Sequence, residues 1–433
     1  MKRPWLQRVR SLAGNEFVRS TAALTGGTAV AQILTVAALP FLTRLYSPHD
    51  FSLLAVYLSL LGMVSVIACL RLEIAIPLPE KDEDAAQLLA LSLGSALLVA
   101  TIVGVPSWLW RHQLATLAGA PDLAPYLWLL PLGTWLAGSY AALQYWASRK
   151  KRFTAVARTR MVQAGTGIGA QVALGAAGTA PFGLLFGHML YGGAGALGLA
   201  RQAWRQDRTA IRAVDWHHMR ARFWEYRRFP QYSTFEAAAN SAAIQLPVIL
   251  IAALAAGPEA GFVLLASRAM GAPMQLVGSA VSQVYLSSAP EEMRAGRLRS
   301  FTLGTLGGLA KLGIAPLLVA GVIAPPVFAL VFGEEWRRAG ELVQWMTPWF
   351  ILQFLASPVS MVLHVTGRQR TAAALQITGL LLRSGAVLLA SFVLGGYEAE
   401  AYAVSGAVFY GAYLFIVLLS AGIMNTLSRQ SKA

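Results

Sequence analysis

Charged residues are scarce in this sequence. They make up 13% of its 433 residues, about half the share of a soluble domain, whereas hydrophobic residues make up 56%. A soluble globular protein of this size needs more surface charge, and a disordered chain has a much lower hydrophobic content. The composition therefore excludes both classes and predicts an integral membrane protein.

Sequence signatures of catalysis are also lacking. Cys69 is the single cysteine, so no disulfide can form within the chain. The P-loop pattern, the Gly-x-Ser-x-Gly elbow, His-Glu-x-x-His and Cys-x-x-Cys are all missing. We therefore expect a protein that is not an enzyme, with no catalytic residue, no metal site and no cofactor.

Long apolar runs dominate what is present. About twelve runs of about 20–27 residues are each long enough to cross a hydrocarbon core of about 30 Å. The predicted spans are 21–42, 51–74, 85–110, 122–147, 156–177, 181–203, 230–256, 260–287, 301–325, 342–365, 371–395 and 400–426. Little chain is left for loops, so the predicted fold class is an all-α integral membrane protein with about twelve transmembrane helices.

Basic residues are distributed unevenly over the loops. Of the 35 lysines and arginines, 28 lie in the two tails and in alternate loops, four in the other loops and three within spans. Cytoplasmic loops carry such an excess, so both termini are predicted to be cytoplasmic. The net charge of +15 is thus explained by membrane orientation, and we expect no nucleic acid partner.

The longest loop, 204–228, divides the spans six and six. Within it Trp216, Met219, Phe223 and Tyr226 recur at helical spacing among arginines, which favours a short amphipathic helix on the inner leaflet over a solvated linker. We therefore predict a six-helix lobe at 1–203, a cytoplasmic linker at 204–228 and a second lobe at 229–433.

The two predicted lobes share a short pattern. Residues 48–55 (PHDFSLLA) resemble residues 258–266 (PEAGFVLLA) with one inserted residue. A glutamine lies upstream of each, Gln32 and Gln245, and both are candidate substrate-binding residues. Because each lobe has an even number of spans, the repeat is predicted to be parallel, about a pseudo-two-fold axis along the membrane normal.

Three basic residues lie deep within predicted spans: Arg268, Lys311 and Arg383. An ionisable group near the bilayer centre costs about 2.5 kcal/mol or more, so each is a candidate functional residue. Each could instead neutralise a nearby carboxylate or extend toward the membrane surface. Because guanidinium groups bind phosphate in a bidentate manner, a cavity lined by these cations suits a phosphate or diphosphate head group.

Acidic residues within spans are few. Arg71 and Glu73 stand together at the end of the second span and are expected to pair, whereas Glu236 lies alone near the start of the seventh. Glu236 could couple transport to protons or neutralise one of the cations. Five further glutamates near the predicted outer ends are attributed to simple solvation: Glu334, Glu335, Glu341, Glu398 and Glu400.

Several segments together resemble a known family. They are LPFLTRLYSPHDFSLLAVY (39–57), RLEIAIPLP (71–79), RRFPQYSTF (227–235), VFGEEWRRAGELV (331–343) and SPVSMVLHVTGRQR (357–370). In order and spacing they resemble the bacterial flippases for polyprenyl-diphosphate-linked oligosaccharides, within the multidrug/oligosaccharidyl-lipid/polysaccharide exporter superfamily. The chain departs from the related lipid II flippases, because two additional C-terminal spans are missing.

The resemblance implies a fold and an activity. It implies two six-helix lobes in a V shape around a central cationic cavity, alternating access, and a bacterial inner-membrane location. The substrate would be a polyprenyl-diphosphate-linked glycan used for O-antigen or exopolysaccharide, and Arg268 matches the cavity-facing basic position of related lipid flippases. Membrane lipids and a glycan polymerase or other polysaccharide-assembly proteins are the implied partners.

Two other functions remain open at this point. A multidrug antiporter of the same superfamily would need a carboxylate within the membrane for cations, and Glu236 is the candidate. A membrane-embedded glycan polymerase or acyltransferase would need converging acids or histidines at the outer face.

Overall fold

The computed structural model describes residues 16–255, 257–366 and 368–430. The predicted cytoplasmic tails therefore fall partly outside the described residues. The elements described are helical and follow in the order α2 (Glu16–Leu45), α3 (Pro48–Ser65), η1 (Leu72–Ala75), α4 (Asp82–Leu109), α5 (Arg111–Leu117), η2 (Pro121–Tyr126), α6 (Leu129–Arg149), α7 (Phe153–Ala176), α8 (Phe182–Gly193), α9 (Gly195–Gln206), α10 (Arg208–Arg212), α11 (Trp216–Glu225), η3 (Phe229–Ser233), α12 (Thr234–Leu254), α13 (Glu259–Arg294), α14 (Leu298–Phe332), η4 (Glu334–Trp336), α15 (Arg337–Val359), α16 (Val362–Val365), α17 (Gln369–Val393) and α18 (Glu398–Gln430).

Long helices account for the predicted spans. Eight helical stretches of the described chain are long and apolar enough to cross a membrane; they lie in α2, α4, α8–α9, η3–α12, α13, α14, α17 and α18. The other four predicted spans correspond to α3, α6, α7 and α15, which have 18, 21, 24 and 23 residues. These four are less apolar, and α7, for example, contains Arg158 and Arg160.

The chain forms two compact units. Unit 1 comprises the described residues up to Tyr46, together with Tyr57–Thr116 and Pro121–Ser241, and unit 2 comprises Ser47–Val56, Leu117–Ala120 and the described residues from Ala242 onward. Unit 1 thus takes in the 204–228 loop, and unit 2 takes in the start of α3. The functional boundaries predicted at 203–204 and 228–229 stay a prediction.

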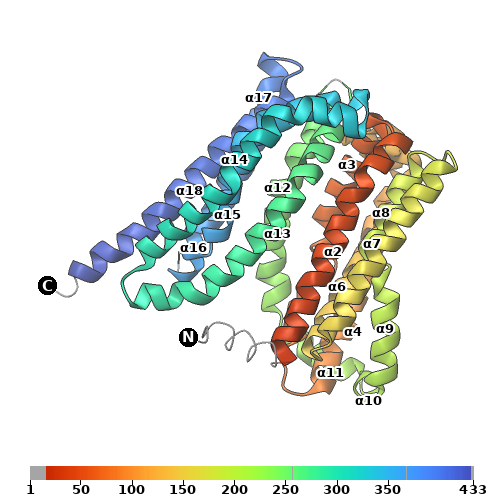
Figure 1. The fold of residues 1–433 in the computed structure, drawn as a ribbon. Coiled ribbons are helices and arrows are strands. Elements are labelled where there is room, and N and C mark those ends of the chain that lie inside the picture. The colour runs from red at the N-terminus through yellow and green to blue at the C-terminus, as the bar shows by residue number, and fades with distance from the viewer. Residues whose placement is uncertain (1–15, 256, 367, 431–433) are drawn as a thin grey trace, which may run out of the picture. The chain divides into compact units, whose positions relative to one another are not determined.

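Unit 1 is a bundle in which α2 packs on α7, α7 on α8, and α4 on α6 (Figure 1). Its core includes Ile76, Leu88 and Trp146, each at most 1% exposed. Because lipid is as apolar as these side chains, close packing between the helices, rather than transfer from water, stabilises the part of this core that lies within a membrane. At the α10–α11 end, Asp207 after α9 accepts hydrogen bonds from both terminal nitrogens of Arg152, at 2.6 and 2.7 Å, and from Trp146 Nε1 at 2.9 Å.

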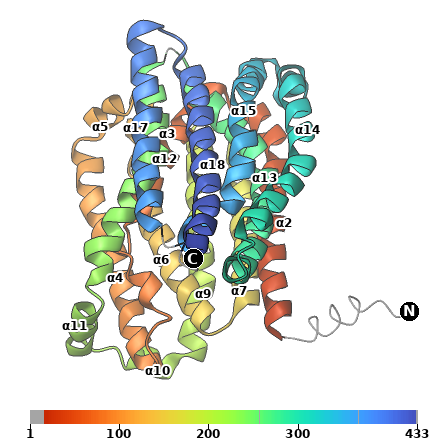
Figure 2. The same cartoon turned by 90° about the vertical axis from the view of Figure 1, so that its left-hand side faces the viewer.

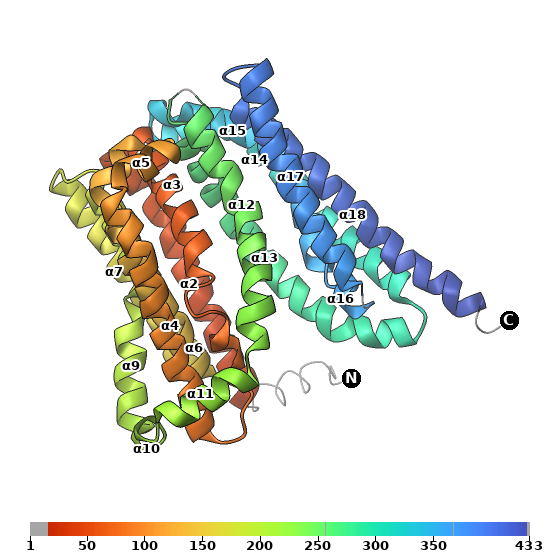
Figure 3. The same cartoon turned by 180° about the vertical axis from the view of Figure 1, so that it is seen from behind.

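A short helix lies at one end of unit 1, as the sequence predicts. α11 starts after Asp215, whose carboxylate accepts hydrogen bonds from the backbone amides of His217 and His218 and so caps the helix. Figure 3 shows α11 beside α10 at the end of unit 1, where it also contacts α4. Trp216 and Trp224 are 75% and 55% exposed. These exposed indoles are consistent with the predicted contact with a membrane surface.

Unit 2 is a second bundle. In it α15 packs against α13, α14 and α18, and α17 packs on α18 (Figure 2). One part of its core surrounds Tyr285, whose hydroxyl shares a hydrogen bond of 2.7 Å with the Thr302 hydroxyl between α13 and α14.

The two copies of the repeated sequence pattern, at the start of α3 and at the start of α13, lie against each other inside unit 2. Phe51 of α3 and Phe262 of α13 occupy the same position of the pattern, and their ring centroids lie 4.8 and 6.0 Å from that of the fully buried Trp336. Gly261 brings the start of α13 against the backbone of Pro48–Ser52, where any Cβ would crowd main-chain atoms. The start of α3 therefore joins unit 2 through a close backbone contact.

The second predicted span differs from the structure at its end. We expected a helix to residue 74, but α3 ends at Ser65 and the chain continues through turns into η1. Leu70 and Arg71 both have positive φ, 51° and 60°, which is unfavourable for residues other than glycine. Glu73 is buried at this point and Arg71 is partly exposed. The irregular backbone is packed within unit 1, where an interrupted helix is tolerated.

Candidate functional site

The polar face of α13 is the first part of the candidate site. Arg268 is partly buried, and Gln275, Ser279 and Ser282 follow it after 7, 11 and 14 residues, a spacing that places all four on one side of the helix. Gln275 and Ser279 are exposed. Polar groups on a membrane-spanning helix face the protein interior or water rather than lipid, so this side of α13 is suited to a polar ligand.

The sequence analysis identified only Arg268 on this face. Gln275, Ser279 and Ser282 were missed, although their helical spacing from Arg268 was available in the sequence. Ser279 Oγ donates to the Leu276 carbonyl at 3.1 Å and keeps its lone pairs for a ligand hydroxyl. An arginine followed by an amide and two hydroxyls offers contacts for a phosphate and for sugar hydroxyls.

Lys311 lies near the middle of α14 and is exposed. Gly304, Gly307 and Gly308 precede it on the same side, and no atom lies within 4 Å of the point where a Cβ would stand on any of them. Because helical side chains lean toward the N-terminus, the ammonium group projects over this open glycine surface. Lys311 is therefore accessible to a ligand.

Unit 1 has a polar surface of its own on α2 and α7. Arg160 Nη1 donates to Thr28 Oγ1 at 2.7 Å, and Gln32 follows Thr28 by one helical turn. Arg160 lies in the second turn of α7. Gln32 and Gln245, the matching glutamine in α12, are both partly buried.

Arg71 and Glu73 form an ion pair of 3.6 Å at the break after α3. Glu73 is 5% exposed, and its Oε2 and the Arg71 Nε have no hydrogen-bond partner within the described chain. Glu236 differs from Glu73 because it is exposed, in the first turn of α12. A coupling role for any of the three stays a prediction.

Arg383 lies in a different environment from Arg268 and Lys311. It is 5% exposed, and its Cζ lies 4.6 Å from the centroid of the Phe409 ring and 6.0 Å from that of Trp349. These surroundings place Arg383 within the packed interior of unit 2. Contact between Arg383 and a substrate stays a prediction.

The glutamates near the predicted outer ends of α13, α15 and α18 form an ion-pair cluster. Arg338 pairs with Glu259 at 3.1 Å, with Glu341 at 3.4 Å and closely with Glu400. Glu398 and Glu400 are 2% and 6% exposed. Solvation, our explanation from sequence, is therefore wrong for these two residues, because neighbouring helices bury them.

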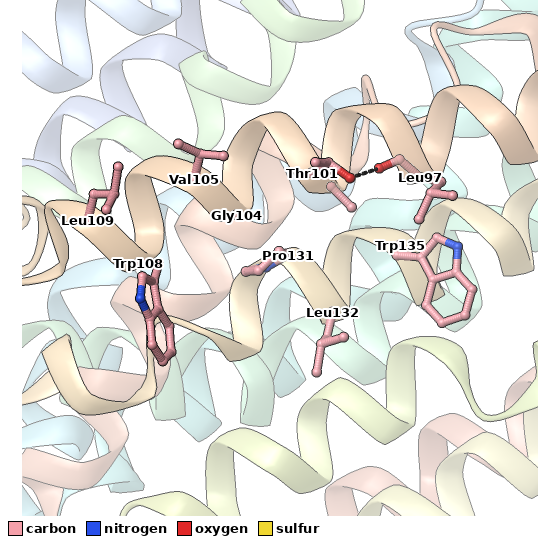
Figure 4. Close-up of a pocket in the computed structure, with 10 residues that line it drawn as sticks. Leu97, Thr101, Gly104, Val105, Trp108, Leu109, Pro131, Leu132 and Trp135 are labelled. Atoms are coloured by element: carbon pink, nitrogen blue, oxygen red, sulfur yellow. Dashed lines mark hydrogen bonds between the residues drawn. The ribbon is translucent and has the colours of Figure 1, made fainter.

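The described residues include no group of three or more His, Cys, Asp or Glu side chains arranged to hold a metal ion. They do include an apolar groove of about 670 Å³ between α4 and α6 (Figure 4). Thr101 is its one hydroxyl-bearing residue, and that hydroxyl donates to the Leu97 carbonyl at 2.8 Å. The groove therefore offers hydrocarbon contacts, and no charged residue lines it.

Comparison with known proteins adds a family and a fold. A family profile described as "Polysaccharide biosynthesis protein" matches residues 41–341, whereas no curated protein sequence matches the chain. Among solved structures, the lipid II flippase MurJ in an inward closed conformation is similar with a TM-score of 0.72 and 13% identity, over 95% of this chain and 93% of that chain.

A multidrug resistance MATE family transporter of the MOP superfamily, in an inward-facing conformation, is similar with a TM-score of 0.68 and 14% identity. That match covers 93% of this chain and 96% of the other. Identities this low show the fold alone. The two structural matches confirm the predicted fold class, an all-α integral membrane protein with the fold found in this superfamily.

Proposed function

The chain belongs to the polysaccharide biosynthesis protein family, and from this premise we propose that it is a flippase for a lipid-linked oligosaccharide. The substrate class is a polyprenyl-diphosphate-linked glycan of O-antigen or exopolysaccharide type. The protein carries it by alternating access from the cytoplasmic to the outer leaflet of a bacterial inner membrane, with both chain termini in the cytoplasm.

The observation that carries this proposal is the composition of the polar face of α13. Arg268 supplies a guanidinium fork for a phosphate oxygen pair, and Gln275, Ser279 and Ser282 supply hydrogen bonds for sugar hydroxyls farther along the same face. Lys311 adds a second accessible cation on α14. A face of this kind favours an anionic glycan over a hydrophobic cation.

The energy of the step is consistent with an anionic substrate. A membrane potential that is negative inside favours outward movement of negative charge by about 2.3 kcal/mol per unit charge per 100 mV. Cations that move with the substrate cancel part of this contribution. The lipid tail needs only apolar contacts, and the α4–α6 groove (Leu97, Gly104, Trp108) is a surface of that type.

The test is glycan display in cells that depend on this protein. Arg268→Ala is expected to lower displayed glycan roughly tenfold or more, as expected for loss of a charge-assisted hydrogen bond, and polyprenyl-diphosphate oligosaccharide should accumulate inside. Arg268→Lys should restore only part, because an ammonium lacks the planar fork. Arg337→Ala is the matched control, since Arg337 is an exposed cation of unit 2 that pairs with Glu334 at 3.5 Å.

Full glycan display by a normally abundant Arg268→Ala protein would contradict the proposal. Unpolymerised glycan units already on the outer side of cells that lack the protein would point to a polymerase instead. Efflux of cationic drugs that requires Glu236 would point to an antiporter.

A further inference from the structure

Arg383 is enclosed by aromatic rings at the middle of α17. Its guanidinium faces Phe409 and Trp349, and the Trp349 centroid lies 5.0 Å from that of Tyr402 and 6.4 Å from that of Tyr410. These five side chains, from α15, α17 and α18, are called the Arg383 cage. The guanidinium lies over ring faces that attract cations, which accounts for part of its stability at this depth.

No carboxylate of the described residues pairs with Arg383 in unit 2, and the partner of its guanidinium there is the uncharged Tyr402 hydroxyl, which accepts a hydrogen bond from it. Within the described residues no ion pair joins it to a carboxylate, and the nearest acidic residue of α18, Glu400, is bound to Arg338. Glu400 lies nine residues before Phe409, or about 13 Å along the helix axis. A buried charge without a counter-charge is strongly unfavourable, and aromatic faces alone do not neutralise it.

The atoms left without partners at the cage are hydrogen-bond donors. Arg383 Nε, Trp349 Nε1 and Ser384 Oγ are buried, and none has a hydrogen-bond partner among the described residues. In unit 2 the other unpartnered buried side-chain atoms are carboxylate oxygens of Glu398 and Glu400, at the start of α18. A site with a positive charge and spare donors requires a ligand that accepts hydrogen bonds and carries negative charge.

We propose that the Arg383 cage binds a small inorganic anion of the size of chloride. Arg383 supplies the charge, and Trp349 Nε1 and Ser384 Oγ supply additional donors. A small anion is the matching ligand class because Arg383 is only 5% exposed, which disfavours a large ligand. The bound anion neutralises the guanidinium and stabilises the packing of α17 against α15 and α18. This site is independent of the proposed transport function.

The test is the dependence of stability on chloride, measured on the full-length protein in detergent. Tryptophan fluorescence gives the unfolding midpoint in sodium chloride and in sodium gluconate at equal ionic strength. The midpoint is expected to rise with chloride, by a similar increment for each tenfold increase above the dissociation constant, and bromide should replace chloride. Equal midpoints in chloride and gluconate would overturn the proposal.

Variants locate the effect. Arg383→Met, which fills the cage without charge, should remove the chloride dependence, whereas Lys311→Met, which removes an exposed cation of the same unit, should keep it. Retained dependence in Arg383→Met would also overturn the proposal.

A milder variant covers the case in which Arg383→Met does not fold. Trp349→Phe keeps an aromatic ring and removes the indole donor, so the chloride concentration above which the unfolding midpoint starts to rise should increase roughly tenfold, the effect of one hydrogen bond to a charged partner. An unchanged concentration would contradict the assignment of this donor cluster as the binding site.

Discussion

The contact between α3 and α13 leads to a quantitative prediction for Gly261→Ala. An added Cβ would lie 2.7 Å from Ser52 N and 3.1 Å from Phe51 C, and closer still to the Pro48 carbonyl oxygen, whereas ordinary contacts are about 3.4–4 Å. All three neighbours are backbone atoms, so no side chain can rotate away. The start of α3 must therefore shift.

The magnitude follows from two opposing effects. Forcing an extra carbon into a closely packed site costs about 1–3 kcal/mol. Replacing glycine by alanine in a helix returns about 1 kcal/mol at most, and less in the first turn, where Gly261 lies. We expect net destabilisation of about 1–2 kcal/mol, accompanied by loosening of Trp336 between Phe51 and Phe262.

The matched control is Gly271→Ala on the same helix. No atom lies within 4 Å of a Cβ at Gly271, so helix propensity alone acts there and this variant should be neutral or stabilised by about 1 kcal/mol. The assay is thermal unfolding in detergent, followed by tryptophan fluorescence. A midpoint for Gly261→Ala at or above that of Gly271→Ala would refute the reasoning.

Two further predictions concern the α10–α11 end of unit 1. Burial raises the pKa of the Asp207 carboxyl, but hydrogen bonds from Arg152 and Trp146 outweigh this effect and hold the pKa below its usual value. The resulting stabilisation is present above the unfolded pKa of about 3.9 and is lost as the pH falls through the lowered pKa. Asp207→Asn should therefore lower the unfolding midpoint at pH 7 and by less at pH 3, and a difference that stays constant with pH would contradict the assignment. The excess of basic residues in the 204–228 loop further predicts that this loop is cytoplasmic. A cysteine at position 218, in a Cys69→Ala background, should therefore resist a membrane-impermeant thiol reagent in intact cells, although the His218 side chain is 65% exposed on the protein. Rapid labelling would reverse the proposed orientation.

The all-α membrane fold and the approximate positions of its long helices could be predicted from the sequence. A span requires a local run of apolar residues of sufficient length, and this condition is independent of what the helix packs against. The α11 helix was predictable for a similar reason, because Trp216, Met219, Phe223 and Tyr226 recur at helical spacing among arginines. Family membership could likewise be recognised from short contiguous sequence segments.

The break after α3 was not predictable from hydrophobicity. Residues 66–76 are as apolar as the helix before them, and the polar pair within them, Arg71 and Glu73, is compatible with an ordinary helix end. The positive φ values of Leu70 and Arg71 are maintained by packing within unit 1. Local sequence patterns do not contain that information.

The different positions of the deep cations were also decided by the tertiary structure. Depth in the sequence grouped Arg268, Lys311 and Arg383 together, because in a span that is apolar on all sides the pattern does not show which side packs against neighbours. Packing of α15 and α18 buries Arg383 among rings, whereas Lys311 stays exposed beside glycines. The sequence by itself placed these charges within predicted spans; contacts between distant helices determined that Arg383 is buried while Lys311 is exposed.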